Sequence, residues 1–203
     1  MRDNVDDPIH RDFLISARLN HLHVLFLLSR VPIPRLNEPN DALVDVACQM
    51  LQLVVETILI RDELANSGTT VSWKVAYYGL PAAGIIILAT LRKPAASDKL
   101  RTLNFQAFQD LVVFGSELTR GTVVKPGDPN YALLLKAAHT IHRFLDFIHS
   151  GEESQEVPHS PQILQSQDDE LLYIPELDPD FWSSEASFWE GLADHPFLDT
   201  QFS

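Results

Sequence analysis

The sequence predicts an all-α fold of about five mostly antiparallel helices around a proline-kinked, apolar central helix, followed by an acidic tail. Two observations lead to this prediction. Apolar residues recur at helical spacing in five separate stretches, and no stretch shows convincing strand-like alternation. The connections between these stretches are short and marked by proline or glycine, which is typical of antiparallel neighbours in a helical bundle.

Charge divides the chain into a helical body, residues 1–150, and a tail, residues 151–203. Residues 1–149 hold 15 acidic and 15 basic side chains, whereas residues 150–203 hold 13 acidic side chains and no Lys or Arg. The whole net charge of −13 therefore lies in the tail. Neither part has the clustered Lys and Arg that bind phosphate, so we expect no direct nucleic-acid binding by this chain.

The single cysteine, Cys48, excludes a disulfide framework or a cysteine-built zinc site within this chain. No His or basic residue is placed beside it, so we interpret it as a buried structural thiol and not as a nucleophile. The first twelve residues are acidic and polar, and no apolar signal-type core follows them. We therefore expect an intracellular protein without a signal peptide.

The first helix is expected from about Ile9 to Ser29, where apolar residues recur at helical spacing. His21 and His23 lie two residues apart, about 200° around a helix, so they cannot share one metal ion. Three prolines in residues 30–41 then predict an extended connector.

The second helix should begin at an Asn40 or Asp41 cap and continue to Ala65 or Asn66. Its polar side chains follow one narrow stripe at helical spacing: Asp45, Gln49, Gln52, Glu56 and Glu63. We interpret this stripe as a solvated edge and not as a catalytic pair of carboxylates, because no apolar residues surround it to raise a pKa. The wide apolar remainder predicts neighbours on two sides of this helix.

The apolar stretch 73–92 should be the central helix. It has no charge from Val75 to Leu91, and these 17 residues are the lower limit for crossing a hydrocarbon core of about 30 Å. Amphipathic helices flank the stretch on both sides, so we expect a buried core helix and no membrane span. Pro81 lacks an N–H group, which predicts a kink or break near Tyr77–Leu80.

The fourth helix should begin at Ser97 or Asp98 and bury one apolar face, with Glu117 among the residues on the opposite face. A turn-rich loop follows from Gly121 to Asn130. The fifth helix is expected from about Asn130 to Ser150, again with one apolar face.

The fifth helix also carries the most metal-like group of side chains in the sequence, within about 80° on the face opposite the core. This group consists of His139, His142, Asp146 and His149. It supports an alternative function, a helical metal-dependent or acid–base enzyme. A face opposite the core normally meets solvent, however, so we interpret the group as a titrating surface.

Four stretches of the sequence, taken in order, are HLHVLFLLSRVPIP, NDALVDVACQMLQLVVETI, WKVAYYGLPAAGIIILATLRK and GDPNYALLLKAAHTIHRFLDFI. Together they resemble the fungal-specific transcription factor domain, the helical regulatory region of fungal zinc-cluster transcription factors. The similarity covers roughly residues 10–150 and corresponds to the later half of that domain. The Gly-Leu-Pro-Ala-Ala-Gly segment is its most distinctive part.

The resemblance implies a nuclear, non-enzymatic regulatory domain. In that family a six-cysteine, two-zinc module binds DNA. This chain has one cysteine and lacks that module, so we expect no cofactor here and zinc only in the module of a full-length relative. The chain is then either a short relative or part of a longer factor. A small-molecule effector near Trp73, Tyr77 and Tyr78 would suit a regulatory domain, although such aromatic residues fill a core equally well.

The tail changes character along its length. Residues 151–170 have the Ser, Gln, Glu and Asp content of a disordered linker. Aromatic residues then appear among the acids, and Asp178 and Pro179 suit the start of a helix. One face of such a helix would present Phe181, Phe188 and Leu192, flanked by Trp182 and Trp189.

Three interpretations of this aromatic segment stay open. It is a partner-binding segment that lays its aromatic face into a groove on another protein, such as a transcriptional coactivator. Alternatively, it folds back onto the helical body as a sixth element. In the third interpretation it is solvated and inert.

Overall fold

The structure, a computed structural model, describes residues 7–30, 40–65, 71–91, 105–128 and 130–153. Within these ranges it contains five helices and no strands, which confirms the predicted all-α class. The helices are α1 (Pro8–Arg30), α2 (Asp41–Leu59), a continuous run of α3 (Val71–Lys74), η3 (Val75–Gly79) and α4 (Leu80–Leu91), then α6 (Phe105–Thr119) and α7 (Tyr131–Glu153).

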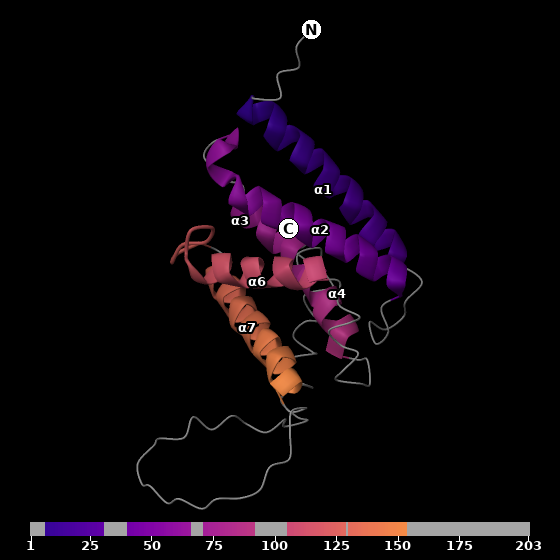
Figure 1. The fold of residues 1–203 in the computed structure, drawn as a ribbon. Helices are drawn as coiled ribbons and strands as arrows, with labels where there is room; N and C mark the ends of the chain where they lie inside the picture. The colour runs from indigo at the N-terminus through magenta and orange to yellow at the C-terminus, as the bar shows by residue number, and fades with distance from the viewer. Residues whose placement is uncertain (1–6, 31–39, 66–70, 92–104, 129, 154–203) are drawn as a thin grey trace, which may run out of the picture.

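Helix α2 contacts most of the other helices. It packs against α1 on one side and against α4 and α6 on the other, and α7 in turn packs against α6. Figure 1 shows α1 in indigo along one edge of the body, with α2 running back beside it. The prediction that α2 has neighbours on two sides is confirmed, and its polar stripe is exposed as expected.

The start of α2 follows the prediction, but its end does not. Asn40 is the N-cap, and its side-chain oxygen accepts a hydrogen bond from the backbone N–H of Leu43 at 2.7 Å. The predicted continuation to Ala65 or Asn66 is wrong, because the α-helix ends at Leu59. A 3-10 turn, η1 (Arg61–Glu63), follows instead, and the Arg61 guanidinium donates to the Ile58 carbonyl at 3.0 Å.

The apolar run 71–91 is irregular where the proline predicts it. Residues Val75–Gly79 form a π-helical turn, in which the N–H of Leu80 donates to the carbonyl of Val75. Pro81 offers no N–H to the turn before it, and a π turn is one way for a helix to accommodate that loss. The predicted kink or break near Tyr77–Leu80 therefore takes the form of a wider turn within a continuous helix.

Helix α4 is the apolar centre of the body. Its residues from Leu80 to Leu88 are all buried. By length and composition alone, both Asp41–Leu59 and Val71–Leu91 could cross a membrane. Most of Val71–Leu91 is buried inside the protein, which is the environment of a core helix in a soluble protein.

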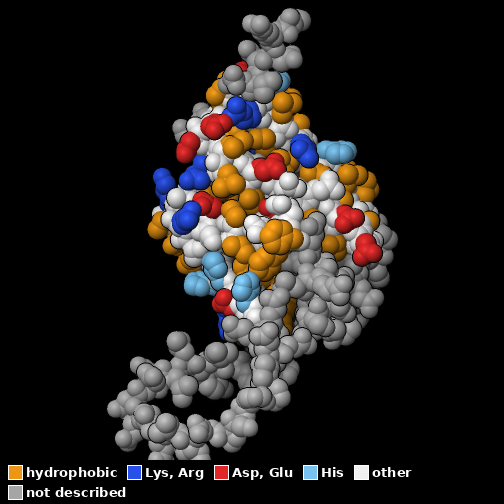
Figure 2. Space-filling model, in the orientation of Figure 1, with side chains coloured by type: hydrophobic (Ala, Val, Ile, Leu, Met, Phe, Trp, Pro, Cys, Tyr) orange, Lys and Arg blue, Asp and Glu red, His pale blue; other side chains and the backbone are white. Residues whose placement is uncertain are grey.

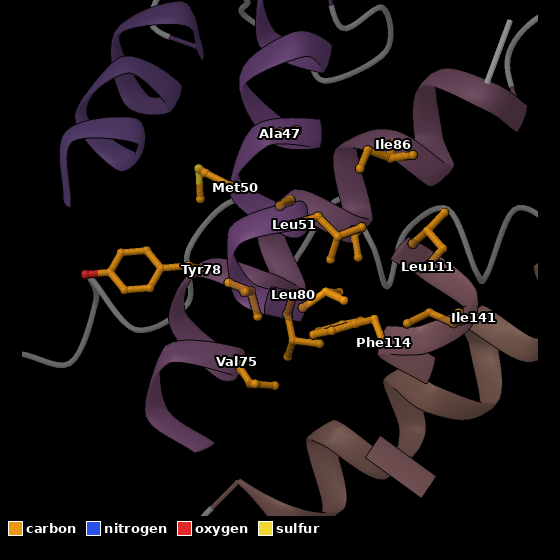
Figure 3. Packing of buried hydrophobic residues seen from close by; sticks show 14 of the residues in the cluster. Ala47, Met50, Leu51, Val75, Tyr78, Leu80, Ile86, Leu111, Phe114 and Ile141 are labelled. Carbon is orange, nitrogen blue, oxygen red and sulfur yellow. The ribbon is translucent and has the colours of Figure 1, made fainter. Parts of the chain in front are cut away.

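Gly79 lets α6 approach the central helix closely. A Cβ atom built at Gly79 would lie 2.8 Å from two ring carbons of Phe114 and 3.2 Å from Cγ1 of Val54. Figure 3 shows the Phe114 ring among the buried side chains, with Leu80 and Ile141 near it. The absence of a side chain at Gly79 is therefore what makes room for this ring.

Candidate interaction surface

A cluster of aromatic rings joins α1 to the beginning of the central helix. Trp73 stacks on Tyr77 with ring centroids 4.9 Å apart and an interplanar angle of 11°. Tyr77 meets Tyr78 edge-on at 4.9 Å, and His23 of α1 lies edge-on to both tyrosines at 4.9 and 5.5 Å. These edge-to-face and stacked pairs are favourable beyond the area that they bury.

Burial changes the pKa values of two side chains in this aromatic cluster, Tyr78 and His23. The Tyr78 hydroxyl donates to the side-chain oxygen of Asn20 in α1 at 2.7 Å. Burial, together with the neighbouring Tyr77, raises the pKa of Tyr78, and burial lowers the pKa of His23. The rings pack against one another here and Trp73 is 52% exposed, and a small-molecule effector near Trp73 stays a prediction.

Ion pairs hold the first turns of α1 against the body. Lys74 at the end of α3 pairs with Asp12 at 2.5 Å, and the Lys74 side chain is only 4% exposed. Arg11 pairs with Glu63, just past the end of α2. The acidic side chain within α1, Asp12, is therefore engaged on the inner side of the helix.

The opposite side of α1 faces outward and is mostly apolar. We call this surface the outer face of α1. Phe13 and Leu28, near its two ends, are 67% and 62% exposed. The apolar residues of the outer face are Ile9, Phe13, Leu14, Ala17, Val24, Leu25 and Leu28. An apolar strip of this length on a helix surface commonly marks a protein–protein contact.

The polar groups on the outer face are neutral or basic. His10, Arg18 and His21 are exposed among the apolar side chains, and no exposed residue of α1 is acidic. Arg18 forms no ion pair with any residue in the described ranges. Figure 2 shows hydrophobic side chains beside His and Lys or Arg side chains along the upper right edge, where α1 runs in Figure 1. The outer face therefore suits an apolar partner that carries negative charge.

The predicted partner-binding residues cannot be placed on this surface. Phe181, Trp182, Phe188, Trp189 and Leu192 all lie outside the described residues. The sequence predicts a disordered linker in residues 151–170. Residues 151–153 form the end of α7 instead, and residues 154–170 lie outside the described residues.

The predicted histidine group on α7 does not converge on one point. His142 is half-buried, and its Nε2 lies 3.3 Å from the Thr119 hydroxyl of α6. The His149 ring stacks on Phe108 of α6, while His139 and Asp146 are exposed. His142 lies on the side of α7 against which α6 packs, and the interpretation of the group as a titrating surface stays a prediction. No group of three or more His, Cys, Asp or Glu in the described ranges is arranged to hold a metal ion.

Sequence reasoning placed Glu117 on the outer side of α6, but its carboxylate is buried. Arg120 donates to it at 2.6 Å, Thr122 donates at 3.1 Å, and Arg61 lies 3.5 Å away. In the sequence, Arg120 three residues after Glu117 is the one sign that this carboxylate has a partner. Arg61 comes from η1, so no spacing within α6 could have predicted it.

A second buried carboxyl, Asp110, was also missed. Burial raises the pKa of Asp110, although Gln106 donates to it at 2.9 Å and opposes the effect. Glu56 of α2 raises it further. The Asp110 carboxyl lies where α6 meets α2, close enough to Cys48 to raise the pKa of its thiol.

Cys48 is half-buried, and its thiol is a poor nucleophile. Burial, with smaller effects from Asp45 and Asp110, raises the pKa of Cys48 from 9.0 to about 11. Because the thiolate is the reactive form, at pH 8 Cys48 should react with iodoacetamide roughly 100-fold more slowly than a thiol at the ordinary value. Mass spectrometry over time would measure this rate, which should rise with pH, and glutathione in the same tube is the control. Equal rates for the two thiols would contradict the burial described here.

Comparison of the chain with protein-family models, curated proteins and solved structures finds no match.

Proposed function

We propose that this chain regulates transcription as a non-catalytic helical interaction domain, and that its acidic tail binds a protein partner such as a transcriptional coactivator. The observation that carries the proposal is the outer face of α1. It presents an apolar strip free of carboxylates on a helix that ion pairs and an aromatic cluster hold against the body. Such a surface works by contact with another polypeptide and requires no cofactor.

The assignment to transcription, and to the nucleus, is supported by the resemblance of residues 10–150 to the fungal-specific transcription factor domain. The chain has a single cysteine and a body without net charge, so DNA binding is left to another module or another chain. In this proposal the contribution of the 203 residues is to make protein contacts.

The tail supplies the second contact. Its acidic residues keep the segment soluble when free, and its aromatic residues bury apolar area when a partner groove receives them. A helix of twelve to fifteen residues is only marginally stable alone in water, so folding and binding would occur together.

The test is a reporter assay. Residues 168–203 fused to a neutral DNA-binding module should raise transcription. Changing Phe181, Trp182, Phe188 and Trp189 to Ala should abolish the effect, because each aromatic anchor of an interface contributes about 2 kcal/mol or more. The matched control changes Ser183, Ser184 and Ser187 to Ala, which keeps the acids and aromatics, and it should stay active. An inactive parent fusion would remove the tail from the proposal.

A further inference from the structure

We propose that the outer face of α1 is a docking surface for the segment Asp178–Leu192 of the same chain. The inference deepens the proposed function, since it gives the partner-binding segment a second place to bind within its own molecule. It rests on the composition, charge and length of the two surfaces.

Composition and charge make the two surfaces complementary. The outer face is apolar, with Arg18, His10 and His21 among its exposed groups and no carboxylate. The segment has Asp180, Glu185 and Glu190 and no Lys or Arg. Opposite charge favours this pairing, and in a helical segment Glu185 lies on the aromatic face itself, four residues after Phe181.

Charge also decides against a second copy of the chain as the occupant. Two outer faces brought together antiparallel would place the Arg18 guanidinium of one copy near that of the other, since Arg18 lies at the middle of the strip. No exposed acidic residue of α1 is available to offset the repulsion. The acidic segment of the tail removes this conflict.

The outer face is long enough for the segment. At 1.5 Å per residue, the outer face from Ile9 to Leu28 extends over about 28 Å, and a helical Asp178–Leu192 would extend over about 21 Å. Twenty-four residues lie between Glu153 at the end of α7 and Asp178. Fully extended, they span about 80 Å, whereas a body of this size has a radius of gyration of about 15 Å. The connection therefore permits the contact wherever α7 ends.

Paramagnetic relaxation in the full-length chain tests the proposal. A nitroxide is attached at Ser187→Cys, which in a helix lies away from the aromatic face, and Cys48 is left unlabelled because its thiol reacts slowly. Amide signals of residues 13–28 should broaden, while those of residues 131–148 should not. The broadening should weaken in 1 M salt, where the screening length falls to about 3 Å.

Two variants and a mixing control make the result decisive. Val24→Glu with Leu28→Glu places negative charge on the outer face at exposed positions, so the body should still fold and the broadening should be lost. Phe105→Glu adds a charge at an exposed apolar position of α6 and should leave the broadening unchanged. Broadening of an unlabelled chain mixed with nitroxide-labelled chain would show contact between molecules and would overturn the proposal, as would broadening confined to α6 or α7.

The outcomes separate this inference from the proposed function. If the isolated tail activates the reporter but α1 shows no broadening, only the docking on α1 is wrong. If α1 is broadened but the isolated tail is inert, the docking stands and the recruiting role of the tail is wrong.

Discussion

Phe114→Ala is expected to lower the free energy of unfolding by about 3–5 kcal/mol, the usual cost of removing a large buried ring. Phe114 is fully buried where α6 meets the central helix. Urea denaturation followed by circular dichroism would measure the loss. Phe105→Ala in the same helix is the matched control, and because that ring is 74% exposed its effect should stay within about 0.5 kcal/mol.

Gly79→Ala tests the same contact from the other side. The added methyl group would meet the Phe114 ring at 2.8 Å, so the substitution should cost about 1–3 kcal/mol alone. In the Phe114→Ala background the methyl group has room, and most of that cost should disappear. Strictly additive effects of the two substitutions would show that the ring does not occupy the space beside Gly79.

The second large effect is expected at the ion pair between α1 and α3. Asp12→Ala removes one carboxylate partner of an almost fully buried ammonium group, so it should cost about 1–3 kcal/mol. Lys74→Met should cost clearly less, because it removes the buried charge, keeps an apolar side chain of similar length, and leaves Asp12, which water reaches.

Denaturation of the two variants in parallel gives this comparison directly. Glu63→Gln is the control, since the Glu63 side chain is 63% exposed and its pair with Arg11 should contribute about 0–1 kcal/mol. The test is whether Asp12→Ala lowers the free energy of unfolding more than Lys74→Met does. A larger loss for Lys74→Met than for Asp12→Ala would mean that the ammonium group does not depend on Asp12 for its burial.

Local patterns were enough to predict the helices and several of their ends. The Asn40 cap and the irregular turn ahead of Pro81 follow from properties of single residues, and the structure has both. The end of α2 could not be predicted in this way. The exit from the helix at Ile60 is accompanied by a hydrogen bond from the Arg61 side chain, and helical periodicity does not report such contacts.

The candidate surface was less predictable for a related reason. The spacing of apolar residues in α1 predicts a helix, but it does not say which side a neighbour covers, so the exposure of Phe13 and Leu28 was not foreseen. The buried carboxylate of Glu117 lies beside Arg61, which is 56 residues away along the chain. Contacts between distant residues of this kind decide burial, and a single sequence gives no direct sign of them.

The π turn at Val75–Gly79 has a geometric consequence for the whole of α3. One residue corresponds to about 100° of rotation about a helix axis, so the extra residue in this turn sets the direction in which the preceding side chains point. Lys74 reaches Asp12 of α1 in that orientation and Trp73 packs on Tyr77 and Tyr78, while α4 keeps its own packing in the interior. Insertion or deletion of one residue within this turn would rotate the α3 side chains away from α1 and leave the packing of α4 unchanged.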